Sequence, residues 1–252
     1  MTDRFPPARR LEDDGEHTIL WLHDDSVDAD LEFARDPVNG IDGVGISPAR
    51  GCSSVLSLEP FVDLPLRVIV VAGADVDLRS ARHIRTLTCL RSDGRSPGVD
   101  MRALSALAEA TLRYDKRHRW PENPASLRRC RLTGWKAKDL SFLARAESLG
   151  DLVLVGGRIH SLDGLRSART IQAHGVSDLW ALGTPPTNLE RLQVEDCRSI
   201  TDWHALSACP NLRVLVLSGC GVVPSIRFLS DLPNLERVVL SGTRVKDGDM
   251  RP

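Results

Sequence analysis

The chain has 252 residues, 42% of them hydrophobic, and a formal net charge of -1 at neutral pH. This composition is typical of a folded globular protein, and the balance of charges disfavours general nucleic-acid binding, which needs a basic surface. No apolar run reaches the length of a membrane span, so we expect neither a membrane nor a nucleic-acid partner. The first residues contain no apolar signal core, which predicts a cytoplasmic protein.

Residues 1–40 differ from the rest, and we expect an N-terminal cap or a degenerate first repeat there. The stretch TILWLHDD (18–25) alternates as a strand does, and VDADLEFARD (27–36) predicts a turn or a short helix. The run HDDSVDAD (23–30) lacks the spacing and the glycine of an EF-hand loop, so we interpret it as an acidic surface turn and expect no metal site.

From residue 41 onwards the sequence repeats the pattern Leu-x-x-Leu-x-Leu, most clearly in CPNLRVLVLSGC (209–220) and LPNLERVVLSGT (232–243). Leu-x-Leu predicts a short strand with alternate side chains inward, and the other residues must cross back so that the next strand can lie parallel. A single unit cannot bury its apolar face, so the units are expected to stack into a column. About ten units of 18–25 residues occupy 41–245, beginning at Ile41, Leu66, Ile84, Leu107, Leu127, Leu149, Ala168, Leu189, Leu212 and Leu235.

This pattern resembles that of leucine-rich repeat proteins, and the return segments, with apolar residues spaced by three at Ile159, Leu162 and Leu165, resemble the bacterial, internalin-like short-repeat class. The resemblance implies an α/β solenoid, a curved horseshoe with a parallel β-sheet on the concave face. Short helices, 3-10 turns or loops would form the convex face. Residues 246–252 are expected to form a short polar tail that leaves the edge of the last strand partly open.

The ninth position of the units departs from the family pattern. Its usual asparagine, which bonds neighbouring loops, is absent from every unit, and the last three units carry Cys197, Cys220 and Thr243 there. Cysteine, serine and threonine offer weaker hydrogen bonds, so we expect an irregular solenoid, distorted at the short units that begin at Leu66 and Leu149. The six cysteines form no Cys-x-x-Cys pair, and we interpret them as buried thiols rather than disulfides or zinc ligands.

Alternate strand residues that point away from the core are expected to line the concave face. We predict exposed apolar residues there, which favour a contact surface. They are Val68, Val70, Val153, Val155, Val214, Val216 and Val239, and Gly43 and Gly45 are predicted to line the same face at its N-terminal end.

Charged residues gather in the middle units, where Arg113, Arg129 and Arg131 are predicted to form a basic patch beside Glu109 and Asp151. Two interpretations remain open: pairing across strands that only solvates the sheet, or an arginine-centred hot spot with an apolar surround. The predicted partner-binding residues are Thr86, Thr88, Glu109, Thr111, Arg113, Arg129, Arg131, Asp151, Gln172, His174, Arg191, Gln193, Glu195 and Trp120.

The segment YDKRHRWPENP (114–124) replaces a normal return segment. It predicts either an exposed loop with Trp120 packed on the solenoid or a basic, aromatic contact with a partner. The basic run is too short to favour nucleic acid on its own.

No HExxH, GxSxG or P-loop motif is present in the sequence. We therefore expect a non-catalytic module, without a cofactor, that binds a protein partner of unknown identity through the concave face. Such a bacterial protein could be an immunity or inhibitor protein that plugs a toxin, or an adaptor in a complex; a preformed arc loses little entropy on binding.

The alternative is a small-molecule or peptide-modifying enzyme centred on His174, Arg191 and Glu195, because these residue types permit acid–base chemistry. For self-association we expect a monomer or a weak homodimer through the C-terminal edge.

Overall fold

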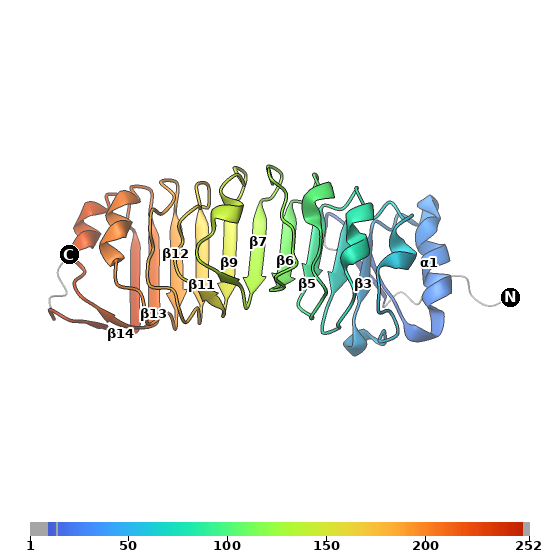
Figure 1. The fold of residues 1–252 in the computed structure, drawn as a ribbon, viewed down its shortest axis with the longest axis horizontal. Coiled ribbons are helices and arrows are strands. Elements are labelled where there is room, and N and C mark those ends of the chain that lie inside the picture. Colours follow the sequence, from blue (N-terminus) through green and yellow to red (C-terminus); the bar gives the residue numbers. More distant parts are fainter. Residues whose placement is uncertain (1–9, 14, 249–252) are drawn as a thin grey trace. The chain divides into compact units, whose positions relative to one another are not determined.

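The computed structural model describes residues 10–13 and 15–248, and the chain divides into two compact units, residues 1–121 (unit 1) and 122–252 (unit 2). In each unit, successive repeats contribute one strand to a sheet, followed by a return segment (Figure 1). Parts of the predicted cap and tail, residues 1–9, 14 and 249–252, lie outside the described residues.

Unit 1 contains one sheet in which β2 to β6 run parallel in chain order, while β1 pairs antiparallel with β2. The strand expected within residues 18–25 is β2, and it lies beside β3 as a further repeat would. The strands are β1 (Leu11–Asp13), β2 (Thr18–Trp21), β3 (Gly43–Ile46), β4 (Val68–Val71), β5 (Cys89–Ser92) and β6 (Glu109–Arg113).

The connections of unit 1 hold one α-helix and several single turns of 3-10 helix. Helix α1 (Val27–Arg35) buries Leu31 and Ala34 and ends where Asp36 precedes Pro37, a residue that disfavours a helical conformation before it. The 3-10 helices are Asp24–Ser26, Pro37–Asn39, Pro48–Arg50, Glu59–Phe61, Arg79–His83 and Met101–Ala103.

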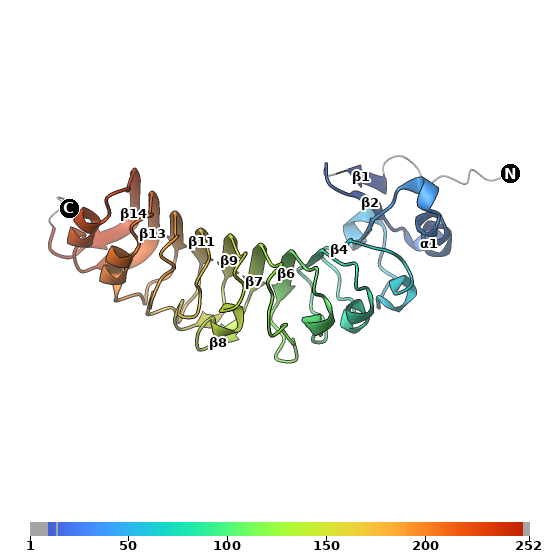
Figure 2. The ribbon, with the colours of Figure 1, turned by 90° about the horizontal axis from the view of Figure 1, so that it is seen from above.

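Unit 2 contains a parallel sheet of six strands in the order β7-β9-β11-β12-β13-β14 and a second parallel pair, β8 with β10. In Figure 2 the pair and the short helices lie on one face of the larger sheet. The strands are β7 (Arg129–Thr133), β8 (Lys136–Ala137), β9 (Asp151–Val155), β10 (Arg158–Ile159), β11 (Thr170–His174), β12 (Arg191–Glu195), β13 (Val214–Val223) and β14 (Arg237–Val245), and the 3-10 helices are Ser141–Leu143, Trp203–Ala208 and Arg227–Asp231.

The same backbone turn precedes β5, β6, β7, β9, β12, β13 and β14. The N–H of the first leucine of a repeat donates to the carbonyl three residues earlier, as in Leu107 to Leu104 (3.1 Å) and Leu212 to Cys209 (3.1 Å). The inward side chains of each strand then stack on those of its neighbours, and most are no more than 2% exposed. This stacking is the continuous core that a single repeat could not form.

The predicted repeat beginning at Ile84 is wrong by three residues. Leu87 donates its N–H to Ile84, so Ile84 occupies the turn position and Leu87 begins the repeat. In the sheet Ile69 pairs with Leu90, which puts Leu90 inward. Repeat starts at 66, 87 and 107 are separated by 21 and 20 residues, so the expected distortion after Leu66 is absent.

Two ladders of side chains connect the repeats of unit 2. At the ninth position, the Cys220 thiol donates to the Val194 carbonyl (3.2 Å), and the Thr243 hydroxyl donates to the Leu217 carbonyl (3.3 Å), which confirms the expectation of substitute hydrogen bonds. The second ladder was not predicted. Its amides, which donate to carbonyls of the preceding repeat at 2.8–2.9 Å, belong to Asn188, Asn211 and Asn234.

The last repeat of unit 2 is less buried than the others. Val238 on β14 is 38% exposed, whereas Leu215, its neighbour on β13, is 1% exposed. Across the described part of the chain, no helix has the length and apolar character needed to cross a membrane.

Candidate functional site

The face of each sheet that carries no return segment is called the open face below. In unit 2 the strand register divides its side chains into three rows that run across the strands. The first row is Arg129, Asp151, Thr170, Arg191, Val214 and Arg237; the second is Arg131, Val153, Gln172, Gln193, Val216 and Val239; the third is Thr133, Val155, His174, Glu195, Ser218 and Ser241.

A connected polar network occupies the centre of this open face. Arg191 Nη2 donates to Gln193 Oε1 (3.1 Å), and Gln193 Nε2 donates to Glu195 Oε1 (2.6 Å). The other carboxylate oxygen of Glu195 lies 2.9 Å from His174 Nδ1, and His174 Nε2 lies 3.4 Å from Gln172 Oε1. These five residues, from β11 and β12, are called the polar network, and all five belonged to the predicted partner-binding set.

The electrostatics of the network follow from its hydrogen bonds. The bond from Gln193 and the bond with His174 both lower the pKa of Glu195 below its ordinary value, so the carboxylate is ionised at neutral pH. An ionised carboxylate can only accept, so His174 Nδ1 is the donor in that contact. A proton on Nε2 would let the ring donate to Gln172 as well.

Half-buried valines flank the polar network on both sides. Val153 and Val155 come from β9, next to β11, and Val214 and Val216 come from β13, next to β12, with Val239 beyond Val216 on β14. A charged and hydrogen-bonding centre between two apolar flanks is a composition found at protein interfaces. The centre can supply specificity and the flanks can supply buried apolar area.

The open face of unit 1 is built differently. Ile19 and Trp21 on β2 lie beside Gly43 and Gly45 on β3, and they pack in one cluster with Val68 on β4. A Cβ atom on Gly45 would stand 2.5 Å from the Trp21 ring, so glycine is what lets the indole lie there. Val68 is 1% exposed, which corrects the expectation of an exposed valine.

Polar contacts hold Trp21 in this cluster. Its Nε1 donates to Glu12 Oε2 (2.8 Å), and the guanidinium of Arg50 lies 4.0 Å from the centre of the indole ring. Arg50 also forms an ion pair with Glu12 at 3.0 Å. The open face of unit 1 at β2 to β4 is therefore occupied by the chain itself.

No protein-family model matches the chain, and no curated protein matches it by sequence. Solved structures do. The crystal structure of an internalin from Listeria monocytogenes is 14% identical with a TM-score of 0.57, and the match covers 90% of this chain and 74% of that one. The leucine-rich repeat domain of APL1B is 17% identical with a TM-score of 0.53, and the match covers 84% of this chain and 60% of that domain.

This is a leucine-rich repeat fold. The predicted α/β solenoid with parallel strands is thus confirmed, while identities this low show only the fold.

The structure corrects the predicted placement of Thr86 and Thr88 on the open face of β5. Thr86 and Thr88 precede the strand, and their hydroxyls donate to the carbonyls of Leu66 (2.6 Å) and Arg67 (3.1 Å). The open-face residues of β5 are Cys89 and Arg91. The displacement of the repeat start by three residues is the reason.

Arg91 was not among the predicted site residues because of the same displacement. Its contacts bear on whether the charged open-face residues pair across strands or form a hot spot. Its guanidinium pairs with both carboxylate oxygens of Glu109 on the neighbouring strand, at 2.5 and 3.2 Å. The predicted site residue Glu109 is therefore held in a cross-strand ion pair. Thr111 lies on β6, opposite Arg91 in the register.

The predicted basic patch draws on both units. Arg113 is exposed at the end of β6 in unit 1, and Arg129 and Arg131 are exposed on β7 in unit 2, where Asp151 on β9 is the register partner of Arg129. The patch as a whole stays a prediction.

The segment 114–124 holds a buried histidine. His118 is 8% exposed; its Nδ1 accepts from the Val99 N–H (3.0 Å), and its Nε2 donates to the Arg113 carbonyl (2.9 Å). Burial lowers the pKa of His118 below its ordinary value. Arg117 pairs with Asp115 at 2.8 Å, so the basic side chains of His118 and Arg117 in this segment contact the chain's own groups.

Trp120 lies within the segment 114–124 and is half-buried. That position agrees with the loop interpretation in which Trp120 packs on the solenoid.

The acidic run at residues 23–30 is only partly a surface turn. Asp24 is exposed and its carboxylate accepts from the N–H groups of Ser53 and Ser54, both at 2.8 Å. Asp30, by contrast, is 3% exposed and pairs with Arg10 at 2.7 Å. No cluster of three or more His, Cys, Asp or Glu side chains within residues 10–13 and 15–248 could hold a metal ion.

The third open-face row contains His174, the residue on which the predicted enzyme alternative depends. A histidine oriented by a carboxylate can act as a general base if a nucleophile lies within hydrogen-bond reach. Here Glu195 lies between His174 and Ser218 in the row, and the other ring nitrogen of His174 faces Gln172. The arrangement suits recognition of polar groups better than activation of a hydroxyl.

Proposed function

We propose that this protein is a non-catalytic protein-binding module that holds its partner on the open face of unit 2. The observation that supports this is the polar network of Gln172, His174, Arg191, Gln193 and Glu195 between two groups of valines. The network fixes its own side chains before binding, so little side-chain entropy is lost when a partner arrives.

The contrast with unit 1 supports the choice of surface. There the open face around Trp21 is buried by the chain's own residues, whereas His174 and Glu195 keep side-chain exposures of 29% and 37%. Exposed hydrogen-bonding groups beside apolar surface can be desolvated by a partner, and such groups contribute most when they become fully buried.

Two roles fit this module: an inhibitor or immunity protein that blocks a toxin, and an adaptor that holds an enzyme in a complex. We further propose a bacterial protein that acts in the reducing environment of the cytoplasm. The buried thiols of Cys197 and Cys220 support this, because they donate hydrogen bonds to main-chain carbonyls and an oxidised sulfur could not.

The test is an affinity capture from the lysate of the source organism with three baits: the wild type, Glu195→Lys and Glu147→Lys. The control, Glu147, is exposed in unit 2 on a return segment, so the change in charge is the same but the surface differs. We expect one stoichiometric partner on the wild type and on Glu147→Lys, and its loss with Glu195→Lys. Equal capture by all three baits would place the contact elsewhere.

The enzyme alternative, centred on His174, Arg191 and Glu195, makes the opposite prediction. His174→Gln would abolish turnover of a substrate and leave capture of the protein partner intact. Under our proposal, His174→Gln weakens capture, because the contact with Glu195 is lost.

A further inference from the structure

A row of four charged residues with alternating sign lies at one edge of the sheet in unit 2, just before the first row of open-face residues. Arg169, Glu190, Arg213 and Glu236 each directly precede a strand, from β11 to β14, and all four are exposed. The backbone joins them: Glu190 donates its N–H to Arg169, Arg213 to Glu190, and Glu236 to Arg213, at 2.8, 2.8 and 2.9 Å. The four side chains thus leave equivalent positions of successive repeats.

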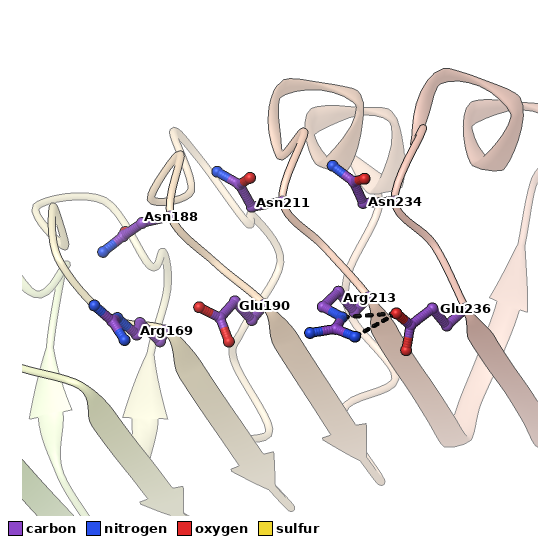
Figure 3. A pocket seen from close by; sticks show the side chains of 7 residues that line it. All are labelled: Arg169, Asn188, Glu190, Asn211, Arg213, Asn234 and Glu236. Atoms are coloured by element: carbon purple, nitrogen blue, oxygen red, sulfur yellow. Dashed lines mark hydrogen bonds and ion pairs between the residues drawn. The ribbon is translucent and has the colours of Figure 1, made fainter.

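The charged row lines an open groove of about 580 Å³ (Figure 3). The three asparagines of the second ladder form its other wall, and each has committed an amide N–H to a carbonyl of the preceding repeat. The main-chain groups along the row are also used between repeats. A molecule that enters the groove therefore meets mainly the four charges and the remaining amide groups of Asn211 and Asn234.

Only half of the row is paired within the chain. Arg213 pairs with Glu236, with Nε and Nη2 at 2.8 and 2.5 Å from Oε1, and these contacts appear as dashed lines in Figure 3. Within the described part of the chain, Arg169 and Glu190 have no ion pair. The row ends at β9, which is preceded by the uncharged Gly150.

The order of charges makes the row its own complement. Read forwards it is Arg-Glu-Arg-Glu, and read backwards it is Glu-Arg-Glu-Arg. Consider a twofold axis that passes between Glu190 and Arg213. It would place Glu190 of one copy against Arg213 of the other, and Arg169 of one copy against Glu236 of the other, and each of these pairs would form twice. The spacing matches because both rows have the strand separation of about 4.8 Å. A parallel copy in register would instead oppose like charges.

We propose that the protein forms a twofold homodimer through this charged row. Exposed ion pairs are individually weak, so the dimer is weak and loses affinity as salt screens the charges. In the dimer, Arg213 would give up its ion pair with Glu236 of the same chain and form one with Glu190 of the second copy. Both are exposed ion pairs, so this exchange costs little. None of the four residues of the row belongs to the polar network, so their variants test the dimer without changing the proposed partner site.

Sedimentation velocity of the full chain at low and high salt tests the proposal. We expect a monomer–dimer equilibrium at low salt whose Kd rises about tenfold or more at high salt, as expected for pairing of exposed charges. A homodimer through the apolar C-terminal edge around Val238 would instead persist at high salt. A strict monomer at every concentration and low salt would overturn the proposal.

Charge-reversed variants provide the sharper test. Arg213→Glu opposes Glu190 with a glutamate and Glu190→Arg opposes Arg213 with an arginine, so each variant alone is expected to be monomeric. Mixed in equal amounts they restore both pairs, so a heterodimer is expected at low salt, which a folding defect could not produce. Glu147→Arg is the matched control and should dimerise like the wild type. Dimers of either single variant, or an unreactive mixture, would contradict the interface.

Discussion

The open faces of the two units are built differently from the same repeat. In unit 1 Gly45 on β3 leaves room for Trp21 and Gly43 leaves room for Ile19, and the face is buried in an apolar cluster that includes Val68. In unit 2 the equivalent rows hold the polar network and half-buried valines, and the described return segments lie on the opposite face of the sheet. The comparison shows that small residues on one strand can turn a recognition face into a second core. It predicts that substitutions in unit 1 lower stability, whereas those in unit 2 lower binding.

The largest expected effect is that of Trp21→Ala. Removal of a buried aromatic side chain, here 7% exposed, should lower the free energy of unfolding by about 3–5 kcal/mol. Denaturant unfolding, with hydrogen exchange of the β3 amides as the local reporter, measures it. The counterpart Val216→Ala on the open face of unit 2 should cost about 1 kcal/mol or less, because that side chain is only half-buried. Equal losses would remove the distinction between the two faces.

Gly45→Ala tests the glycine directly. The added methyl would overlap the Trp21 ring, so we expect a loss of about 1–3 kcal/mol and a change in tryptophan fluorescence as the ring moves. Gly150→Ala is the control in unit 2, since its Cβ would meet only the Arg128 carbonyl at 3.7 Å. A neutral Gly45→Ala would show that the indole has another place to lie.

The buried His118 gives the stability of unit 1 a dependence on pH. Because burial lowers its pKa from the ordinary 6.5, the unfolded chain takes up a proton first as the pH falls. The contribution of neutral His118 is therefore complete above pH 6.5 and is lost as the pH falls through the folded-state pKa. Thermal unfolding from pH 8 to 5 should show a decline that His118→Gln removes and that His83→Gln, at an exposed position, retains. Parallel profiles for all three proteins would contradict the assignment.

The smallest expected effect on stability is that of Glu195→Gln. The side chain is 37% exposed, so the free energy of unfolding should change by less than about 1 kcal/mol. Capture of the partner should nevertheless fall at least tenfold, since the charge at the centre of the network is lost. Denaturant unfolding measured beside partner capture separates the two. A large loss of stability would show that the network maintains the fold.

The sequence predicted most of unit 2 because its Leu-x-x-Leu-x-Leu copies are unambiguous, and their alternation placed all the open-face residues in their observed rows. The prediction of the register was wrong at β5. There Ile84, Leu87 and Cys89 fit the pattern as well as the correct set, Leu87, Leu90 and Ser92. A buried serine at an inward position, Ser92, hid the correct register. Periodicity reports which side a residue faces, and two apolar frames offset by three residues cannot be told apart by it.

Residues outside the repeats were harder to place. The cluster around Trp21 could not be predicted, because it joins the segment before the first repeat to strands of the next ones. Its signal in the sequence was the pair of glycines on β3, which leaves two open-face positions without side chains.

The charged row was also visible in the sequence, as the residue after each Asn-Leu pair is Glu190, Arg213 and Glu236 in turn. Its meaning depends on neighbours that only the fold supplies.

The alternation of charge along that row also limits how this chain can evolve. Each repeat of a solenoid contacts only its neighbours, so a whole repeat can be gained or lost without disturbing distant ones. Deletion of the single repeat that carries Glu190 would set Arg169 beside Arg213, and duplication of it would set two glutamates side by side. Gain or loss of two adjacent repeats preserves the order of signs. The number of repeats in this stretch is therefore expected to change in even steps among descendants of the same ancestor.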